Sequence, residues 1–117
     1  MTQIHIPHSI MRGLLPALAA ASALASLPAA AADDIAGQML LGKQVFTQQC
    51  AVCHTLKDAA AEGAVGPILD ELKPDSARVA KALRDGLGNM PSYKTILSAE
   101  QIAALARYVS KASGGEN

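Results

Sequence analysis

Aromatic side chains are scarce in this chain of 117 residues: it has no Trp, and its only aromatic residues are Phe46, Tyr93 and Tyr108. No charge is in excess either, because ten Lys and Arg balance ten Asp and Glu. That balance argues against a nucleic-acid-binding protein, which carries a basic excess. Half of the residues are apolar, which argues against disorder. So few aromatic residues are a small stock for a hydrophobic core, and we expect something other than side chains to fill part of it.

Cysteine and histidine are equally limited. The chain has two Cys and three His, and two of the His, His5 and His8, lie near the N-terminus. Two Cys cannot build a scaffold of several disulfides. A zinc site needs about four protein ligands, and after residue 32 the chain offers only the two Cys and His54. Both the disulfide-rich class and the structural zinc class are therefore disfavoured.

The first 32 residues have the pattern of a secretory signal peptide. Arg12 is the only charged residue among them, residues 13–32 are rich in Ala, and the segment ends in four consecutive Ala. A basic start, an apolar stretch and small residues before the cleavage site are the signals for export. We expect cleavage after Ala32, which leaves residues 33–117 as one periplasmic domain of 117 − 32 = 85 residues.

An uncleaved membrane anchor is the alternative interpretation of this segment. Residues 13–32 approach the length of a membrane-spanning helix, but they are rich in Ala rather than Leu and contain Pro16 and Pro28. A lipid anchor directly after the cleavage position is excluded, because the first Cys is Cys50. Export would place the domain in an oxidising compartment, with no stable membrane insertion after cleavage.

Apolar spacing predicts a first helix over about residues 36–49. Met39 or Leu40, then Gly42 and Phe46, recur at intervals of three to four residues, with Phe46 as the large anchor. Gly42 lowers helix stability, so its presence suggests that another backbone approaches closely there. Met39 on this helix is expected to be a core residue.

Two more helices are predicted by their capping residues. One follows Pro74, with Asp75 or Ser76 as its N-cap, and ends near Gly86. The other follows Ser98, whose position three residues before a Gln is typical of a capping box.

No convincing strand is found, and residues 55–70 and 89–97 are predicted to be loops. The domain is therefore expected to be all-α, with long loops that need something to pack on.

The motif Cys50-Ala51-Val52-Cys53-His54 carries the chemistry of the chain. C-x-x-C-H is the attachment motif of c-type haem: the two thiols add to the two haem vinyl groups, and the His that follows becomes an axial ligand of the iron. A thioredoxin-like C-x-x-C would lie near a βαβ pattern, which is missing here. A disulfide between the two Cys would close a very small loop and stabilise little. One covalently bound haem c is therefore the favoured cofactor.

The chain resembles class I c-type cytochromes, in which three to four short helices pack around one haem. The resemblance covers essentially all of residues 33–117 and rests on the C-x-x-C-H motif, Gly66-Pro67, Met90-Pro91 and the C-terminal helix with Tyr108. It implies that the first and last helices cross at Gly42, with Phe46 meeting Tyr108. It also implies that the Pro67 carbonyl accepts a hydrogen bond from His54, and that Met90 is the distal iron ligand.

The residues present after residue 32 also limit which side chain can be the sixth iron ligand, whether or not the resemblance holds. A second His ligand is unavailable after residue 32, which leaves Met39, Met90, a Lys or an open position. Met90 lies in a predicted loop that can reach the far face of the haem, whereas Met39 lies on the helix that leads into Cys50. His/Met ligation would raise the reduction potential and saturate the iron. Such a protein transfers single electrons and makes no bonds of its own.

Three functions follow from these observations. The first is a periplasmic electron carrier, a monomer that would dock redox partners through an exposed haem edge near six residues: Ala51, Val52, Gly66, Pro67, Pro91 and Tyr93. The second is the haem subunit of a periplasmic dehydrogenase complex, for instance one that oxidises sulfite. The third is a haem protein with an open iron site. No nucleophile and base pair points to an enzyme, and the neutral charge predicts weak electrostatic steering.

Overall fold

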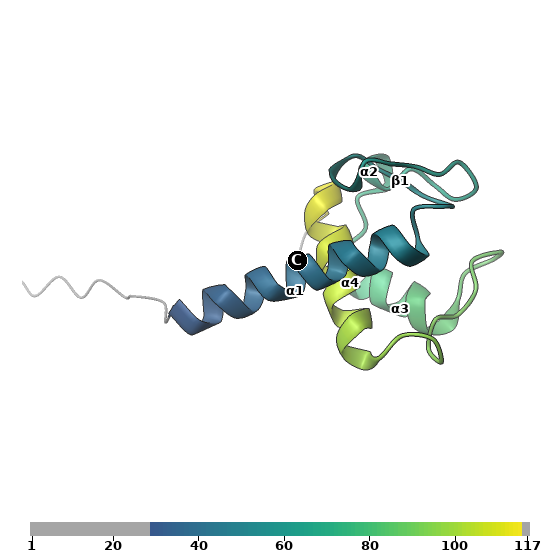
Figure 1. Ribbon diagram of the computed structural model, residues 1–117. Coiled ribbons are helices and arrows are strands. Elements are labelled where there is room, and N and C mark those ends of the chain that lie inside the picture. Colours follow the sequence, from purple (N-terminus) through teal and green to yellow (C-terminus); the bar gives the residue numbers. More distant parts are fainter. Residues whose placement is uncertain (1–28, 116–117) are drawn as a thin grey trace, which may run out of the picture.

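The structure of the protein, a computed structural model, describes residues 29–115 (Figure 1). Its elements follow in this order: α1 (Ala29–Gln49), β1 (Thr55–Leu56), the 3-10 helix η1 (Lys57–Ala59), β2 (Ala61–Glu62), α2 (Leu69–Leu72), α3 (Ser76–Asp85) and α4 (Ala99–Ser113). Helices form most of the described chain, and α1, α3 and α4 are the three helices predicted from the sequence. The expected mostly helical architecture is thereby confirmed.

Helices α1 and α4 cross at the centre of the fold (Figure 1). At the crossing, a Cβ on Gly42 would collide with the Ala104 carbonyl oxygen and with Cβ of Tyr108. Only Gly lets the two backbones approach this closely, which confirms the reason inferred for it. Beside the crossing, the rings of Phe46 and Tyr108 meet edge to face with centroids 6.0 Å apart, a favourable aromatic arrangement.

The helix ends are formed by the capping residues that the sequence predicted. The Asp75 side chain accepts a hydrogen bond from the Arg78 backbone N–H at the start of α3. Ser98 and Gln101 form a complete capping box at the start of α4. Both caps satisfy backbone N–H groups that would otherwise have no partner in the first turn. α4 then buries one face, with Leu105 and Tyr108 almost completely enclosed.

The prediction that residues 55–70 form only a loop is wrong. Thr55 pairs with Glu62 and Leu56 with Ala61 in a small antiparallel sheet, and η1 lies between the two strands. The short helix α2 begins at Leu69, within the same predicted loop. Strands of two residues and a helix of four are too short to produce a periodic apolar pattern. They form because neighbouring segments hold them in place.

The N-terminal part of α1 also differs from the prediction, since the helix begins at Ala29 and not near Ala36. Its first residues are an Ala-rich run, and Ala has the highest helix propensity. The expected cleavage position after Ala32 therefore lies within α1. Residues 1–28 of the predicted signal peptide lie outside the described residues. Within residues 29–115, no helix has the length and apolar character needed to span a membrane.

Candidate haem site

A cavity of about 700 Å³ lies between the helices and the two long loops. Its walls come from the end of α1 and the motif that follows, from residues 65–74, from α3 and the loop after it, and from Leu105 and Val109 of α4. Figure 1 shows the segment with β1 and α2 on one side of the α1–α4 pair and α3 with its following loop on the other. Two separate lobes thus enclose one mainly apolar space.

Four of the predicted site residues line this one cavity: Cys50, Cys53, His54 and Met90. Pro67, the fifth, also lies on its wall. The motif residues come from the first lobe and Met90 comes from the second, so they face the cavity from segments far apart in the sequence. Met39 does not line the cavity. It is partly buried against the hydrophobic core, in the position expected for a core residue.

The C-x-x-C-H motif forms tight turns that continue from the last turn of α1. The Cys50 N–H donates to the Phe46 carbonyl at 2.8 Å, and the His54 N–H donates to the Cys50 carbonyl at 2.9 Å. This helical winding turns both Cys and the His toward the same space. Both cysteines are free thiols in this structure. The thiols are therefore available for covalent attachment.

The imidazole of His54 is held in one orientation. Its Nδ1 donates a hydrogen bond to the Pro67 carbonyl at 2.9 Å. A Cβ on Gly66 would collide with Cε1 and lie 2.8 Å from Nδ1 and 2.9 Å from Nε2, so the Gly backbone packs directly against the imidazole. Because Nδ1 donates to a carbonyl, Nε2 is the ring nitrogen that can bind a metal. A hydrogen bond from the other ring nitrogen fixes the tautomer of a His ligand.

The loop that carries Met90 is closely tied to α3. The Leu87 and Met90 backbones exchange two hydrogen bonds of 3.0 Å each, and the Tyr93 N–H donates to the Leu83 carbonyl at 2.7 Å. Gly86 permits the sharp change of direction, because its φ of +74° lies in the left-handed region and a Cβ there would lie 2.8 Å from the Met90 carbonyl oxygen. This framework holds Met90 at the cavity.

The electrostatics of the site reflect its apolar walls. Burial, with a smaller effect of the neighbouring Cys53, raises the pKa of the Cys50 thiol to about 12. Burial likewise raises the pKa of Tyr93, whose hydroxyl donates to the Gln49 carbonyl at 3.4 Å. A charged group is disfavoured in both places, because the surroundings cannot solvate it. The cavity is suited to a large apolar group rather than to a charged substrate.

These observations fit a covalently bound haem. Two free thiols, an oriented imidazole and a thioether line one apolar space. Cys, His and Met side chains are the ones that hold haem in c-type proteins. The described core contains only Phe46 and Tyr108 as nearly fully buried aromatic residues. A haem bound in the cavity would therefore supply the apolar bulk that the few aromatic side chains do not provide.

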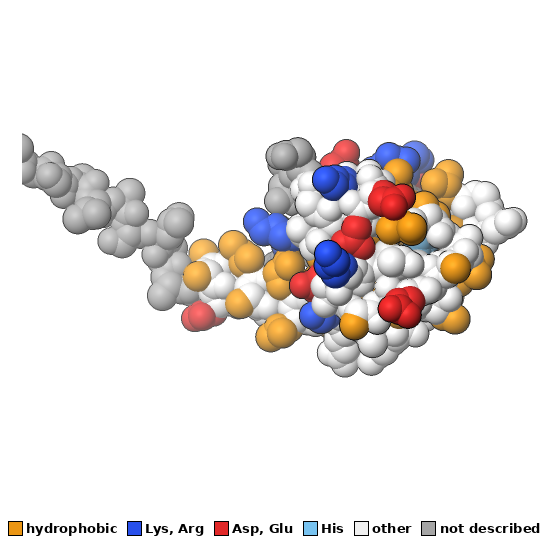
Figure 2. All heavy atoms as spheres, turned by 90° about the horizontal axis from the view of Figure 1, so that it is seen from above, with side chains coloured by type: hydrophobic (Ala, Val, Ile, Leu, Met, Phe, Trp, Pro, Cys, Tyr) orange, Lys and Arg blue, Asp and Glu red, His pale blue; other side chains and the backbone are white. Residues whose placement is uncertain are grey.

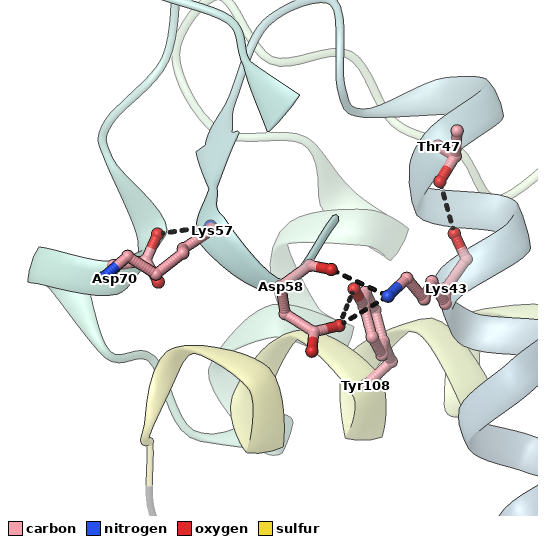
Figure 3. A network of polar contacts seen from close by, with 6 residues as sticks. All are labelled: Lys43, Thr47, Lys57, Asp58, Asp70 and Tyr108. Atoms are coloured by element: carbon pink, nitrogen blue, oxygen red, sulfur yellow. Dashed lines mark hydrogen bonds and ion pairs between the residues drawn. The ribbon is translucent and has the colours of Figure 1, made fainter. Parts of the chain in front are cut away.

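A polar network on the outside of the α1–α4 crossing was not predicted from the sequence (Figure 3). The Tyr108 hydroxyl donates to Oδ2 of Asp58 at 2.6 Å. The Lys43 ammonium lies 3.2 Å from the same oxygen and donates to the Asp58 carbonyl at 2.7 Å. Nearby, Oδ2 of Asp70 accepts from the Lys57 N–H. No local pattern in the sequence indicates this network, because the partners of Asp58 are 15 and 50 residues away.

A mostly helical domain that closes on a cavity lined by a C-x-x-C-H motif defines a c-type haem protein. Comparison with known proteins agrees: residues 37–109 match the family described as cytochrome c oxidase, cbb3-type, subunit III. That match covers well over half of the chain. The chain belongs to the class I c-type cytochromes, proteins that carry covalently bound haem c and transfer electrons.

The chain is also similar to individual known proteins. The chain is 49% identical to the c-type cytochrome SorU from Sinorhizobium meliloti, whose crystal structure it matches with a TM-score of 0.65 over 68% of this chain and 95% of that one. It is 35% identical over 101 residues to the cbb3-type cytochrome c oxidase subunit CcoP of Azospirillum sp. (strain B510), covering 78% of this chain. It is 32% identical over 98 residues to the chloroplastic cytochrome c6 of Chlamydomonas reinhardtii, covering 73% of this chain.

The lengths of these relatives differ. The chain spans 33% of the length of the CcoP protein and 62% of the length of the cytochrome c6 protein. The similarity to these two relatives is therefore to a part of each. The match to the SorU structure, in contrast, covers 95% of that chain.

Proposed function

We propose that this protein is a periplasmic single-electron carrier whose haem c is attached at Cys50 and Cys53, with His54 and Met90 as the axial ligands. The observation that carries the proposal is the single apolar cavity to which all four side chains contribute. When bound, the haem supplies a reversible one-electron couple. The chain attaches the group, positions the two ligands and keeps most of the surroundings apolar.

The contribution of His54 follows from its fixed ring. The bond from Nδ1 to the Pro67 carbonyl and the packing of Gly66 leave little freedom of rotation. A ligand held in place by its surroundings needs no rearrangement when the iron changes its charge. This rigidity favours fast electron transfer over substrate chemistry, and Pro67 acts here as the residue that positions the ligand.

Mass spectrometry tests attachment and processing together. Under denaturing conditions, the protein purified from the periplasm should have the mass of residues 33–117 plus one haem. Loss of the haem under those conditions would contradict covalent attachment. A mass that includes residues 1–32 would contradict cleavage and support a retained anchor.

The Met90 ligand predicts a specific spectrum. The oxidised protein should show a weak near-infrared charge-transfer band from sulfur to iron, and Met90→Ala should abolish it and lower the reduction potential, because a thioether ligand raises that potential. Met39→Ala is the matched control: it removes the only other Met of the described chain, which lies in the core and not at the cavity. An unchanged spectrum in Met90→Ala, or loss of the band in Met39→Ala, would contradict the assignment.

Partner docking is proposed at the open end of the site. Val52 and Val65 are 77% and 80% exposed, and the exposed Pro67 and Pro91 lie on the cavity wall. Figure 2 shows hydrophobic side chains at the end of the molecule remote from the start of α1 as well as along α1, with acidic and basic side chains spread over the middle of this face. An apolar contact surface with mixed charges around it suits short-lived redox complexes.

A second candidate is the haem subunit of a larger redox complex. The similarity to CcoP, an oxidase subunit by its description, favours this alternative, and a dehydrogenase that oxidises sulfite or a similar substrate is the other complex considered. Size-exclusion chromatography of the native periplasmic extract separates the possibilities. A carrier elutes at the size of the domain alone, whereas a subunit elutes together with its enzyme.

An open iron site would indicate a third function, binding of a gas or catalysis at the iron. Carbon monoxide binding to the reduced protein at neutral pH tests for it. The carrier proposal predicts no binding under these conditions, because Met90 occupies the sixth position.

A further inference from the structure

The loop that follows α3 (Figure 1) begins where the backbone hydrogen bonds of that helix end. The last of these bonds runs from the Gly86 N–H to the Ala82 carbonyl at 2.8 Å. The next two carbonyls, those of Leu83 and Arg84, would accept from residues 87 and 88 if the helix continued. The chain turns away at Gly86 instead, with a φ of +74°. These two carbonyls therefore need partners from outside the helix.

Both partners come from the far end of the same loop, beyond Met90. The Tyr93 N–H donates to the Leu83 carbonyl at 2.7 Å. The Ser92 hydroxyl donates to the Arg84 carbonyl. One backbone bond and one side-chain bond thus cap the end of α3, and the same two bonds close the loop that carries the proposed iron ligand.

Ser92 contributes the side-chain part of this closure. Besides donating to the Arg84 carbonyl, its Oγ accepts a hydrogen bond from the Lys94 N–H at 3.3 Å. A Cβ on Gly86 would lie 3.1 Å from the Ser92 nitrogen and 2.8 Å from the Met90 carbonyl oxygen, so the two ends of the loop are packed closely together. Because Met90 precedes Ser92 by only two residues, a movement of Ser92 away from α3 would displace the Met90 backbone as well.

We propose that Ser92 is a positioning residue for Met90: its hydroxyl holds the loop closed on α3 and thereby keeps the thioether at the haem iron. The inference rests on the proposed ligand and goes beyond it, because it names a contact that retains this ligand. Opening of the loop would break the bond from Ser92 to the Arg84 carbonyl. Without that bond, a larger fraction of the molecules should have an open sixth position. Water competes for this exposed hydroxyl, so the effect is of the size of one ordinary hydrogen bond.

Exchange of the sixth ligand tests this inference. Imidazole added at low concentration to the oxidised, haem-loaded protein can bind the iron only when Met90 has left it. Loss of the near-infrared band from sulfur to iron follows the exchange. Ser92→Ala should accelerate the exchange about two- to tenfold, the factor that corresponds to the loss of one hydrogen bond. Ser92→Thr keeps a hydroxyl and should exchange at close to the wild-type rate.

Thr47→Val is the matched control, because it also removes an exposed hydroxyl that donates to a backbone carbonyl. The Thr47 hydroxyl bonds to the Lys43 carbonyl at 2.9 Å, on α1, and Thr47 does not line the cavity. Thermal unfolding of each haem-loaded variant measures its overall stability. A merely structural role of Ser92 would change the unfolding temperature and leave the exchange rate at that of Thr47→Val. A positioning role accelerates the exchange beyond this control.

The outcomes separate this inference from the proposed function. A wild-type protein without covalent haem or without the near-infrared band would overturn the proposed site, and the role of Ser92 with it. A wild-type protein with the band, together with Ser92→Ala that exchanges no faster than the wild type or Thr47→Val, would overturn only the role of Ser92. Equally fast exchange in Ser92→Thr and Ser92→Ala would show that the hydroxyl is not the cause and would likewise overturn it.

Discussion

At the scale of single residues, Tyr108 joins the core to the surface. Its ring is 2% exposed and contacts Phe46, while its hydroxyl reaches the half-exposed Asp58. The bond from Tyr108 chiefly, and the bond and charge of Lys43 after it, hold the pKa of Asp58 below its usual value. Burial and the Asp58 carboxylate raise the pKa of Tyr108. The ring contact was predictable from the sequence, whereas the carboxylate partner was not.

Tyr108→Phe should therefore change stability in a pH-dependent way. A carboxyl with a lowered folded pKa stabilises the protein above its unfolded pKa of about 3.9, and that stabilisation is lost as the pH falls through the folded pKa. We expect the variant to lose about 1 kcal/mol of unfolding free energy at pH 7, an estimate kept small because Asp58 is half-exposed. Urea denaturation of the haem-loaded protein at several pH values measures the difference, which should shrink below about pH 4.

Tyr93→Phe serves as the control for this prediction, since the Tyr93 hydroxyl makes only a 3.4 Å contact with a backbone carbonyl. Tyr93→Phe should lose less unfolding free energy than Tyr108→Phe, and its difference from the wild type should not shrink at acid pH. A constant loss for Tyr108→Phe from pH 7 to pH 3 would contradict the prediction, because it would show that the effect of the hydroxyl does not depend on the ionisation of Asp58.

At the scale of elements, the crossing of α1 and α4 depends on the missing side chain of Gly42. The sequence indicated this residue by its cost to helix stability, and the contact with Ala104 and Tyr108 supplies the reason. The helices with strong caps, α3 and α4, were likewise predictable, because capping is local. The sheet of β1 and β2 was not, since its two-residue strands depend on distant neighbours.

Two Gly→Ala substitutions in the same helix should have opposite effects. Gly42→Ala introduces a Cβ that collides with backbone atoms of α4, and we expect a loss of about 1–3 kcal/mol of unfolding free energy. Gly37→Ala places its Cβ where nothing lies within 4 Å, so it should stabilise α1 by up to about 1 kcal/mol. Thermal unfolding of the haem-loaded variants, followed by circular dichroism, measures both. Equal effects of the two substitutions would contradict the close crossing.

At the scale of the whole molecule, the cavity of about 700 Å³ is as important as the core around it. The matched domain, residues 37–109, is small, and domains of this size commonly need a covalent or metal staple. Attachment at two cysteines combined with two axial ligands would tie the two lobes together. The protein without its cofactor should therefore be much less stable than the haem-loaded form.

Replacing both attachment residues tests this dependence. The double variant Cys50→Ala, Cys53→Ala should lose covalent haem and several kcal/mol of unfolding free energy, because a large cavity is left unfilled. Circular dichroism in the aromatic region and the sharpness of thermal unfolding report the loss. Val52→Ala, in the same turn but 77% exposed, is the control and should retain both. A double variant as stable as the control would show that the side-chain core suffices.

The sequence by itself determined the local features: the C-x-x-C-H motif, the helix caps at Asp75 and Ser98, and the choice of ligands available to an iron. These follow from residue type and spacing within one or two helical turns. Only the tertiary structure decided which distant groups meet. It brought Met90 and the motif to one cavity and gave Asp58 its partner in Tyr108. The physical reason is that such contacts depend on how whole elements pack, and no local pattern in the chain encodes that.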